Sequence, residues 1–103
     1  ILNSINQIEK YTAKVTKGVF EEDELLQDGV IRRFQIIGEA AKRIPAEYKQ
    51  QHAEIPWRLV TGMRDVLVHD YSEANFDRIW HTVKEDLPVF KKQIEQLPEL
   101  SDE

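Results

Sequence analysis

The sequence has 103 residues, which is enough for one domain with a single hydrophobic core. It contains no cysteine, and this excludes a disulfide-stabilised scaffold, a zinc site with thiolate ligands and a cysteine nucleophile. Its net charge of −5 argues against a protein that coats nucleic acid without specificity, because such proteins are normally basic.

The first predicted helix carries one apolar stripe and ends near Gly18, which is expected to act as a C-terminal cap. The chain begins at Ile1 in helical register and without a methionine, so we expect the natural N-terminus to extend further. We find no signal peptide and no apolar run of roughly 20 residues that could span a membrane, and therefore expect a cytoplasmic protein without membrane contact. The stripe consists of Ile1, Ile5, Ile8, Thr12 and Val15.

The second predicted helix begins at the acidic residues 21–24, with Asp23 as its N-cap, and is stopped by Pro45. Gly38 lies in its interior. A glycine there costs up to about 1 kcal/mol, so we expect another backbone to pack closely against it, within the bundle or across a subunit interface. The alternative is a tolerated surface glycine. The apolar stripe of this helix consists of Leu26, Val30, Phe34, Ile37, Ala41 and Ile44.

The middle of the chain is predicted to form a connection with one short helical turn over residues 46–51. A third helix then begins at Pro56, which suits a first helical turn, and runs to about Val68. Residues 69–75 break the pattern, and Asn75 is the predicted N-cap of the last helix.

The last predicted helix contains Pro88, where the missing backbone hydrogen bond predicts a kink or a new start. Residues 98–103 are expected to form an acidic tail. Four helices with short connections predict an all-α fold, a four-helix up-and-down bundle, with one domain over residues 1–97.

An arginine, a histidine and a tyrosine lie close together near the predicted break, at Arg64, His69 and Tyr71. Arginine binds phosphate through a planar fork, and histidine exchanges protons near neutral pH because its unperturbed pKa is about 6.5. These are the groups that RNA cleavage needs when the 2′-hydroxyl beside a phosphate is the nucleophile. Arginine and histidine at this spacing are also common at ordinary helix ends. The pair alone therefore does not indicate a ribonuclease, and the surrounding residues are needed to support that function.

Four segments stand in order along the chain: Gly38-Glu39-Ala40-Ala41, Ile55-Pro56-Trp57-Arg58, Gly62-Met63-Arg64-Asp65 and His69-x-Tyr71. Their order and spacing resemble the HepT-like branch of the HEPN family, small all-helical proteins of prokaryotic toxin–antitoxin pairs. The signature of that branch is Arg-x4-His-x-Tyr with a polar residue directly after the arginine, and Asp65 occupies that position. The resemblance covers nearly the whole chain.

The resemblance implies a metal-independent ribonuclease without a cofactor. His69 would accept the proton of the 2′-hydroxyl, and Arg64 would stabilise the charge on the phosphate, leaving a 2′,3′-cyclic phosphate. Asp65 would orient Arg64 or His69, or would be a solvent-exposed helix acid. We expect no metal site, because the three histidines show no metal-binding spacing and no thiol is present.

The spacing of Arg64 and His69 has a geometric consequence. Five residues of an ideal helix turn by about 500°, so the two side chains point about 140° apart. Either the helix ends before His69, or a second copy completes the site. In the family, a two-fold homodimer brings two Arg/His pairs into one cleft, and the resemblance implies the same dimer here.

The resemblance also implies a partner. In the HepT-like branch the antitoxin, a minimal nucleotidyltransferase, attaches AMP to the tyrosine of the motif, which corresponds to Tyr71. A charged nucleotide there would fill the cleft and compete for Arg64. The alternative is a tyrosine whose ring packs in the bundle.

Two function classes remain open from the sequence. The intact residues Arg64, His69 and Tyr71 favour a toxin ribonuclease that acts on RNA, whereas the net acidity favours a non-catalytic HEPN module that holds a nucleotide or a partner protein in the same cleft. A purely structural bundle would leave this cluster unexplained.

Overall fold

The computed structural model describes residues 1–66 and 70–101, and within these two ranges the chain is helical with no strand. The helical elements are α1 (Leu2–Thr12), α2 (Lys17–Glu22), α3 (Glu24–Lys42), α4 (Ala46–Gln51), α5 (Trp57–Gly62), the 3-10 turn η1 (Met63–Asp65), α6 (Glu73–His81), the π-helical turn η2 (Thr82–Asp86), α7 (Leu87–Glu95) and α8 (Pro98–Ser101). The predicted all-α fold is confirmed.

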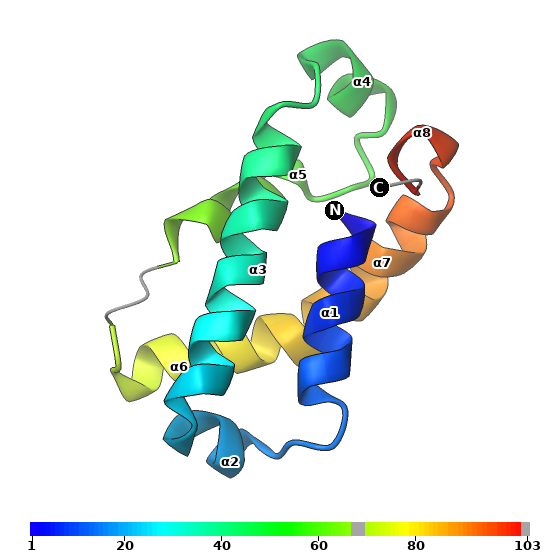
Figure 1. The fold of residues 1–103 in the computed structure, drawn as a ribbon. Coiled ribbons are helices and arrows are strands. Elements are labelled where there is room, and N and C mark those ends of the chain that lie inside the picture. Colours follow the sequence, from blue (N-terminus) through cyan, green and yellow to red (C-terminus); the bar gives the residue numbers. More distant parts are fainter. Residues whose placement is uncertain (67–69, 102–103) are drawn as a thin grey trace.

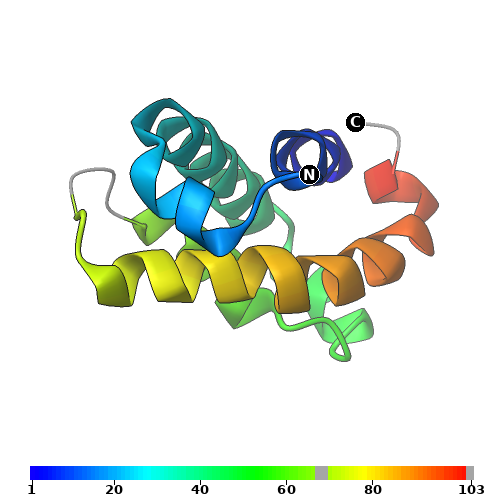
Figure 2. The ribbon, with the colours of Figure 1, turned by 90° about the horizontal axis from the view of Figure 1, so that it is seen from below.

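The long helix α3 is the element against which the others are arranged. It packs against α1 on one side and against α5 and η1 on the other, as Figure 1 shows. The elements α6, η2 and α7 follow one another as a continuous rod, which Figure 2 shows as a layer beneath α1 and α3. None of the described helices is long and apolar enough to cross a membrane.

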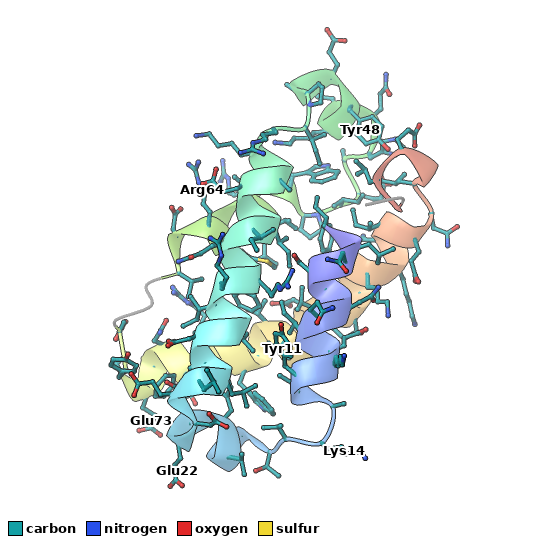
Figure 3. The ribbon with its side chains drawn as sticks, viewed as in Figure 1. Tyr11, Lys14, Glu22, Tyr48, Arg64 and Glu73 are labelled. Carbon is teal, nitrogen blue, oxygen red and sulfur yellow. The ribbon has the colours of Figure 1, made fainter. Side chains whose placement is uncertain are left out.

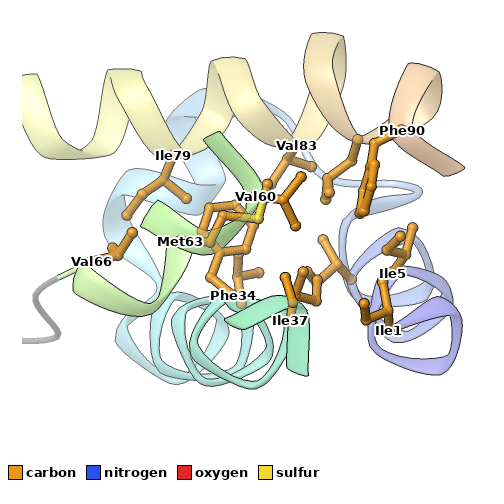
Figure 4. Close-up of a cluster of buried hydrophobic side chains, with 14 of the residues drawn as sticks. Ile1, Ile5, Phe34, Ile37, Val60, Met63, Val66, Ile79, Val83 and Phe90 are labelled. Carbon is orange, nitrogen blue, oxygen red and sulfur yellow. The ribbon is translucent and has the colours of Figure 1, made fainter. Parts of the chain in front are cut away.

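The core is built from apolar side chains that these layers direct inward. Phe34 from α3, Met63 from η1 and Ile79 from α6 are at most 4 % exposed and meet on the side where η1 packs (Figure 4). Their burial fixes η1 between α3 and α6, which matters because η1 carries Arg64.

The first connection differs from the prediction. Gly18 does not end the first helix, because α1 ends at Thr12 and a separate short helix, α2, begins at Lys17. The Thr16 side chain caps α2 by accepting a hydrogen bond from the Val19 backbone N–H at 3.2 Å. A threonine N-cap is a strong start signal that the apolar spacing alone did not reveal.

Asp23 is the N-cap of α3, as predicted, and its carboxylate accepts the Leu26 N–H at 3.0 Å. The predicted short turn over residues 46–51 is also present, as α4.

The third helix is shorter than predicted. It ends at Gly62, passes into η1, and leaves helical geometry at Val66, whose ψ is 124°. The predicted N-cap Asn75 was also wrong: Ser72 caps α6, and its side chain accepts the Asn75 N–H at 3.1 Å. The first error arises because apolar residues continue through a change of backbone geometry. The second arises because α6 begins before its first large apolar residue, Phe76.

The interruption predicted at Pro88 is confirmed. The helix widens into η2 directly before α7, and Pro88, which has no N–H to donate to the preceding turn, occupies the first turn of α7. Beyond Leu97, where we expected a tail, α8 forms one further turn, and Leu100 packs partly against the core.

Candidate functional site

Arg64 lies in η1, which packs directly on α3. A Cβ atom added to Gly38 would lie 2.7 Å from the Cβ and 2.9 Å from the Cα of Arg64, closer than a Cβ atom approaches a non-bonded atom in proteins. Gly38 is buried and has an ordinary helical backbone, so the missing side chain is what permits the contact. The close backbone approach predicted at Gly38 is therefore confirmed, and its partner is Arg64.

Gln35 holds the same segment from a second point. Its Nε2 donates a hydrogen bond to the Val66 carbonyl at 3.2 Å. Gln35 and Gly38 are three residues apart and share one face of α3. Gln35 was not among the residues predicted from the sequence, although its position one turn from an interior glycine is a signal that could have found it.

The Arg64 side chain lies at the surface of the bundle, as Figure 3 shows, and is 31 % exposed. Its Nε lies 3.7 Å from Asp65 Oδ1, and Asp65 is 75 % exposed. An ion pair this long and this exposed contributes little to stability, within about 0–1 kcal/mol. Among the described residues no partner holds the two Nη groups, so the fork that binds phosphate is available.

His69 lies outside the described residues. The chain that follows it is held by hydrogen bonds: the Asn75 side chain donates to the Asp70 carbonyl at 2.6 Å, and the Ser72 N–H donates to the Asp70 carboxylate at 3.1 Å. The hydrogen bonds from Ser72 lower the pKa of Asp70, and the positive charge of Arg78 adds to this effect. Asn75 is only 4 % exposed, so it acts as a fixed anchor for Asp70.

Tyr71 is half exposed, and its hydroxyl donates a hydrogen bond to Glu24 Oε1 at 3.1 Å. Its ring lies beside Phe76, with the ring centroids 6.4 Å apart. The hydrogen bond to Glu24 is the main cause that raises the pKa of Tyr71, because a tyrosinate would face a carboxylate. A groove of about 310 Å³ borders the tyrosine and is lined by acidic residues of α2 and α3.

Arg64 and its neighbour Asp65 lie against one part of α3, whereas Tyr71 lies against another part of the same helix. Tyr71 contacts Glu24 in the first turn of α3, whereas Arg64 contacts Gly38. At 1.5 Å per residue these two points are about 21 Å apart along the helix. Arg64 and Tyr71 of one chain therefore do not form a single compact site.

Comparison with known proteins identifies the family of this arrangement. The family model described as "Ribonuclease HepT-like" matches residues 1–97. The chain belongs to the HepT-like ribonuclease family. A relative from Thermococcus cleftensis, named "Probable ribonuclease HepT", is 43 % identical over 97 residues, which cover 94 % of this chain and 88 % of that protein.

Two further relatives of this HepT-like chain carry ribonuclease names. A Caldanaerobacter subterraneus protein named "Putative RNase TTE0752" is 37 % identical, covering 76 % of this chain and 70 % of the relative. A Methanocaldococcus jannaschii protein named "Gamma-glutamylcyclotransferase and putative RNase MJ0434" is 41 % identical over 96 % of this chain, which spans only 45 % of that longer protein. No solved structure matches the chain.

The Tyr71–Glu24 hydrogen bond of this HepT-like protein gives a direct prediction. Glu24→Gln removes the carboxylate charge, so the pKa of Tyr71 should fall toward its ordinary value of about 10. Because the folded pKa is raised, the hydrogen bond contributes its full stability below pH 10 and loses it as the pH rises through the folded pKa. Ultraviolet titration of tyrosinate measures the shift, with Tyr71→Phe to assign the transition and Glu22→Gln as the matched control. An unchanged titration in Glu24→Gln would show that the two groups are not bonded in solution.

Proposed function

We propose that this protein is a metal-independent endoribonuclease in which Arg64 and His69 cut RNA at the cleft of a two-fold homodimer. The observation that carries the proposal is the close fit of η1 onto Gly38, which fixes a phosphate-binding arginine at the surface five residues before the histidine. Membership of the HepT-like ribonuclease family supports the same activity.

The proposed reaction uses one base and one cation. His69 takes the proton of a 2′-hydroxyl, whose oxygen attacks the adjacent phosphorus, and the bond to the 5′-oxygen breaks as that oxygen takes up a proton from water. Arg64 stabilises the added negative charge on the phosphate. General acid–base catalysis accelerates such a reaction about 10²–10⁴-fold, and stabilisation of the phosphate charge accelerates it by a comparable factor. The products are a 2′,3′-cyclic phosphate and a 5′-hydroxyl.

The proposed homodimer supplies a second Arg/His pair to the same cleft. Two exposed apolar side chains support an interface near η1: Leu59 on α5 is 45 % exposed and Val89 on α7 is 59 % exposed, and both border one groove between these helices. Asp65 is proposed as the residue that orients Arg64, because it is the carboxylate nearest to the guanidinium among the described residues.

We further propose that a nucleotidyltransferase antitoxin silences the enzyme by attaching AMP to Tyr71. The exposed Tyr71 hydroxyl supports this, since a partner enzyme can reach it. Tyr71 and Arg64 contact α3 about 21 Å apart. The added phosphate and adenosine would therefore repel and block RNA on its approach rather than bond to Arg64 of the same chain. Modification would also have to break the hydrogen bond to Glu24.

A non-catalytic binding module is the second candidate, and the net charge of −5 favours it. A cleavage assay on pooled tRNA and mRNA in EDTA separates the two, comparing the wild type with His69→Ala. Intact mass is measured first, because AMP on Tyr71 would silence the preparation. Cleavage that disappears in His69→Ala supports the ribonuclease, and no cleavage by an unmodified wild-type dimer would favour the binding module.

A further inference from the structure

We propose that the groove between α5, η1 and α6 binds one nucleotide of single-stranded RNA, with its phosphate held by Arg58 and Arg78. The inference rests on the proposed ribonuclease function and adds a substrate-binding site to it. We call this the arginine groove; it is bordered by Arg58, Gly62, Met63, Asp65, Arg78 and Ile79.

The two arginines reach the groove from different helices. Arg58 comes from α5 and Arg78 from α6, and both side chains are exposed. Among the described residues neither has a carboxylate within ion-pair distance, and Arg78 makes only a long hydrogen bond of 3.4 Å to the Asn75 side chain. Two guanidinium forks that border one groove and have no described carboxylate within ion-pair distance suit a phosphate group.

The floor of the groove is apolar. Phe34, Met63 and Ile79 form it, and Figure 4 shows these side chains gathered beside Val66. The groove volume is about 290 Å³, at the lower end of the range for small-ligand sites, so it accommodates one nucleotide rather than a folded RNA segment. An apolar floor with charged walls fits a sugar or base below a phosphate.

The arginine groove is continuous with the proposed catalytic site. Asp65 borders the groove and also contacts Arg64 at 3.7 Å, and this ion pair partly offsets the carboxylate charge that a bound phosphate would face. Val66 also borders the groove, and Arg78 acts electrostatically on Asp70. RNA in the groove would therefore place the neighbouring phosphate near Arg64.

Binding is measured by fluorescence anisotropy of a short fluorescein-labelled oligouridylate, with every variant in the His69→Ala background so that cleavage does not interfere. Arg58→Ala and Arg78→Ala are each expected to weaken binding about tenfold, because each removes a charge-assisted contact. The double variant should also lower the dependence of log Kd on log salt by about one unit. Lys14→Ala, which removes the same charge from the exposed connection after α1 (Figure 3), should bind normally.

A steric variant tests the groove without changing its charge. Gly62 borders the groove, and a Cβ added there meets nothing within 4 Å, so Gly62→Leu should fold and place a bulky side chain at the border of the groove. It is expected to weaken oligouridylate binding, and the smaller side chain of Gly62→Ala should weaken binding less than Gly62→Leu does. Arg58→Lys and Arg78→Lys keep the charge but lose the fork, and an intermediate loss is expected.

The outcomes separate this site from the ribonuclease function. If the double variant Arg58→Ala/Arg78→Ala and the variant Gly62→Leu both bind oligouridylate normally, the proposed RNA site in the groove is wrong, even if the wild type with His69 intact cleaves RNA. If the wild type cuts nothing but the groove variants lose oligouridylate binding, the groove stands and the ribonuclease function fails. Thermal unfolding of each variant confirms that loss of binding is not loss of fold.

Discussion

Gly38→Ala is expected to destabilise the protein and to remove most of its RNA cleavage at the same time. The new methyl group would lie 2.9 Å from the Arg64 Cα, so η1 must move away from α3. Overpacking of this kind costs about 1–3 kcal/mol, which exceeds the gain of up to about 1 kcal/mol from alanine in a helix. A displacement of about 1 Å at Arg64, the proposed catalytic arginine, can lower the rate about 100-fold.

Gly62→Ala is the matched control for this substitution. Gly62 is also a helical glycine, but its added Cβ meets no atom within 4 Å. It should therefore raise the free energy of unfolding slightly and lower kcat far less than Gly38→Ala does. Denaturant unfolding and cleavage kinetics measure both effects. Equal behaviour of the two variants would show that η1 does not depend on the contact with Gly38.

Arg64→Ala is expected to lower kcat for RNA cleavage about 100- to 1,000-fold, because it removes the group that stabilises charge in the transition state. The fold should be nearly unaffected, with a change in unfolding free energy within about 0.5 kcal/mol, since the only ion pair of Arg64 that the structure describes is long and exposed. Arg64→Lys keeps a charge but loses the planar fork, so its kcat should lie between that of the wild type and that of Arg64→Ala.

Arg43→Ala is the control for the arginine itself. Arg43 is an exposed arginine at the C-terminal end of α3, and its removal should leave kcat unchanged. Wild-type kcat in Arg64→Ala would remove Arg64 from the proposed mechanism, whatever the variant does to RNA binding.

The helical architecture could be predicted from the sequence because each main stripe is regular and each long helix has a chemical start or stop. Asp23 starts α3, and Pro88 marks the interruption before α7. Where the stripe continued through a change of geometry, prediction failed. The 3-10 turn after Gly62 carries Met63 into the core just as a helix would, so apolar spacing did not reveal it.

The candidate site was predicted only in part, for a similar reason. The motif identified Arg64 and Tyr71, and the interior position of Gly38 indicated a close contact. Neither feature indicated that Gly38 contacts Arg64. Gln35 acts through a backbone carbonyl 31 residues away, and Glu24 bonds a tyrosine 47 residues away. Contacts between residues so distant along the chain depend on packing, which no local pattern encodes.

The measurement that tests the central claim most directly is the chemical identity of the RNA ends that the unmodified protein produces in EDTA. Transfer of the 2′-hydroxyl proton to His69, with Arg64 on the phosphate, must leave a 2′,3′-cyclic phosphate on one fragment and a 5′-hydroxyl on the other. We predict these ends for the wild type and no new ends for His69→Ala. Fragments that carry 5′-phosphate and 3′-hydroxyl ends, or cleavage that EDTA abolishes, would contradict the proposed mechanism.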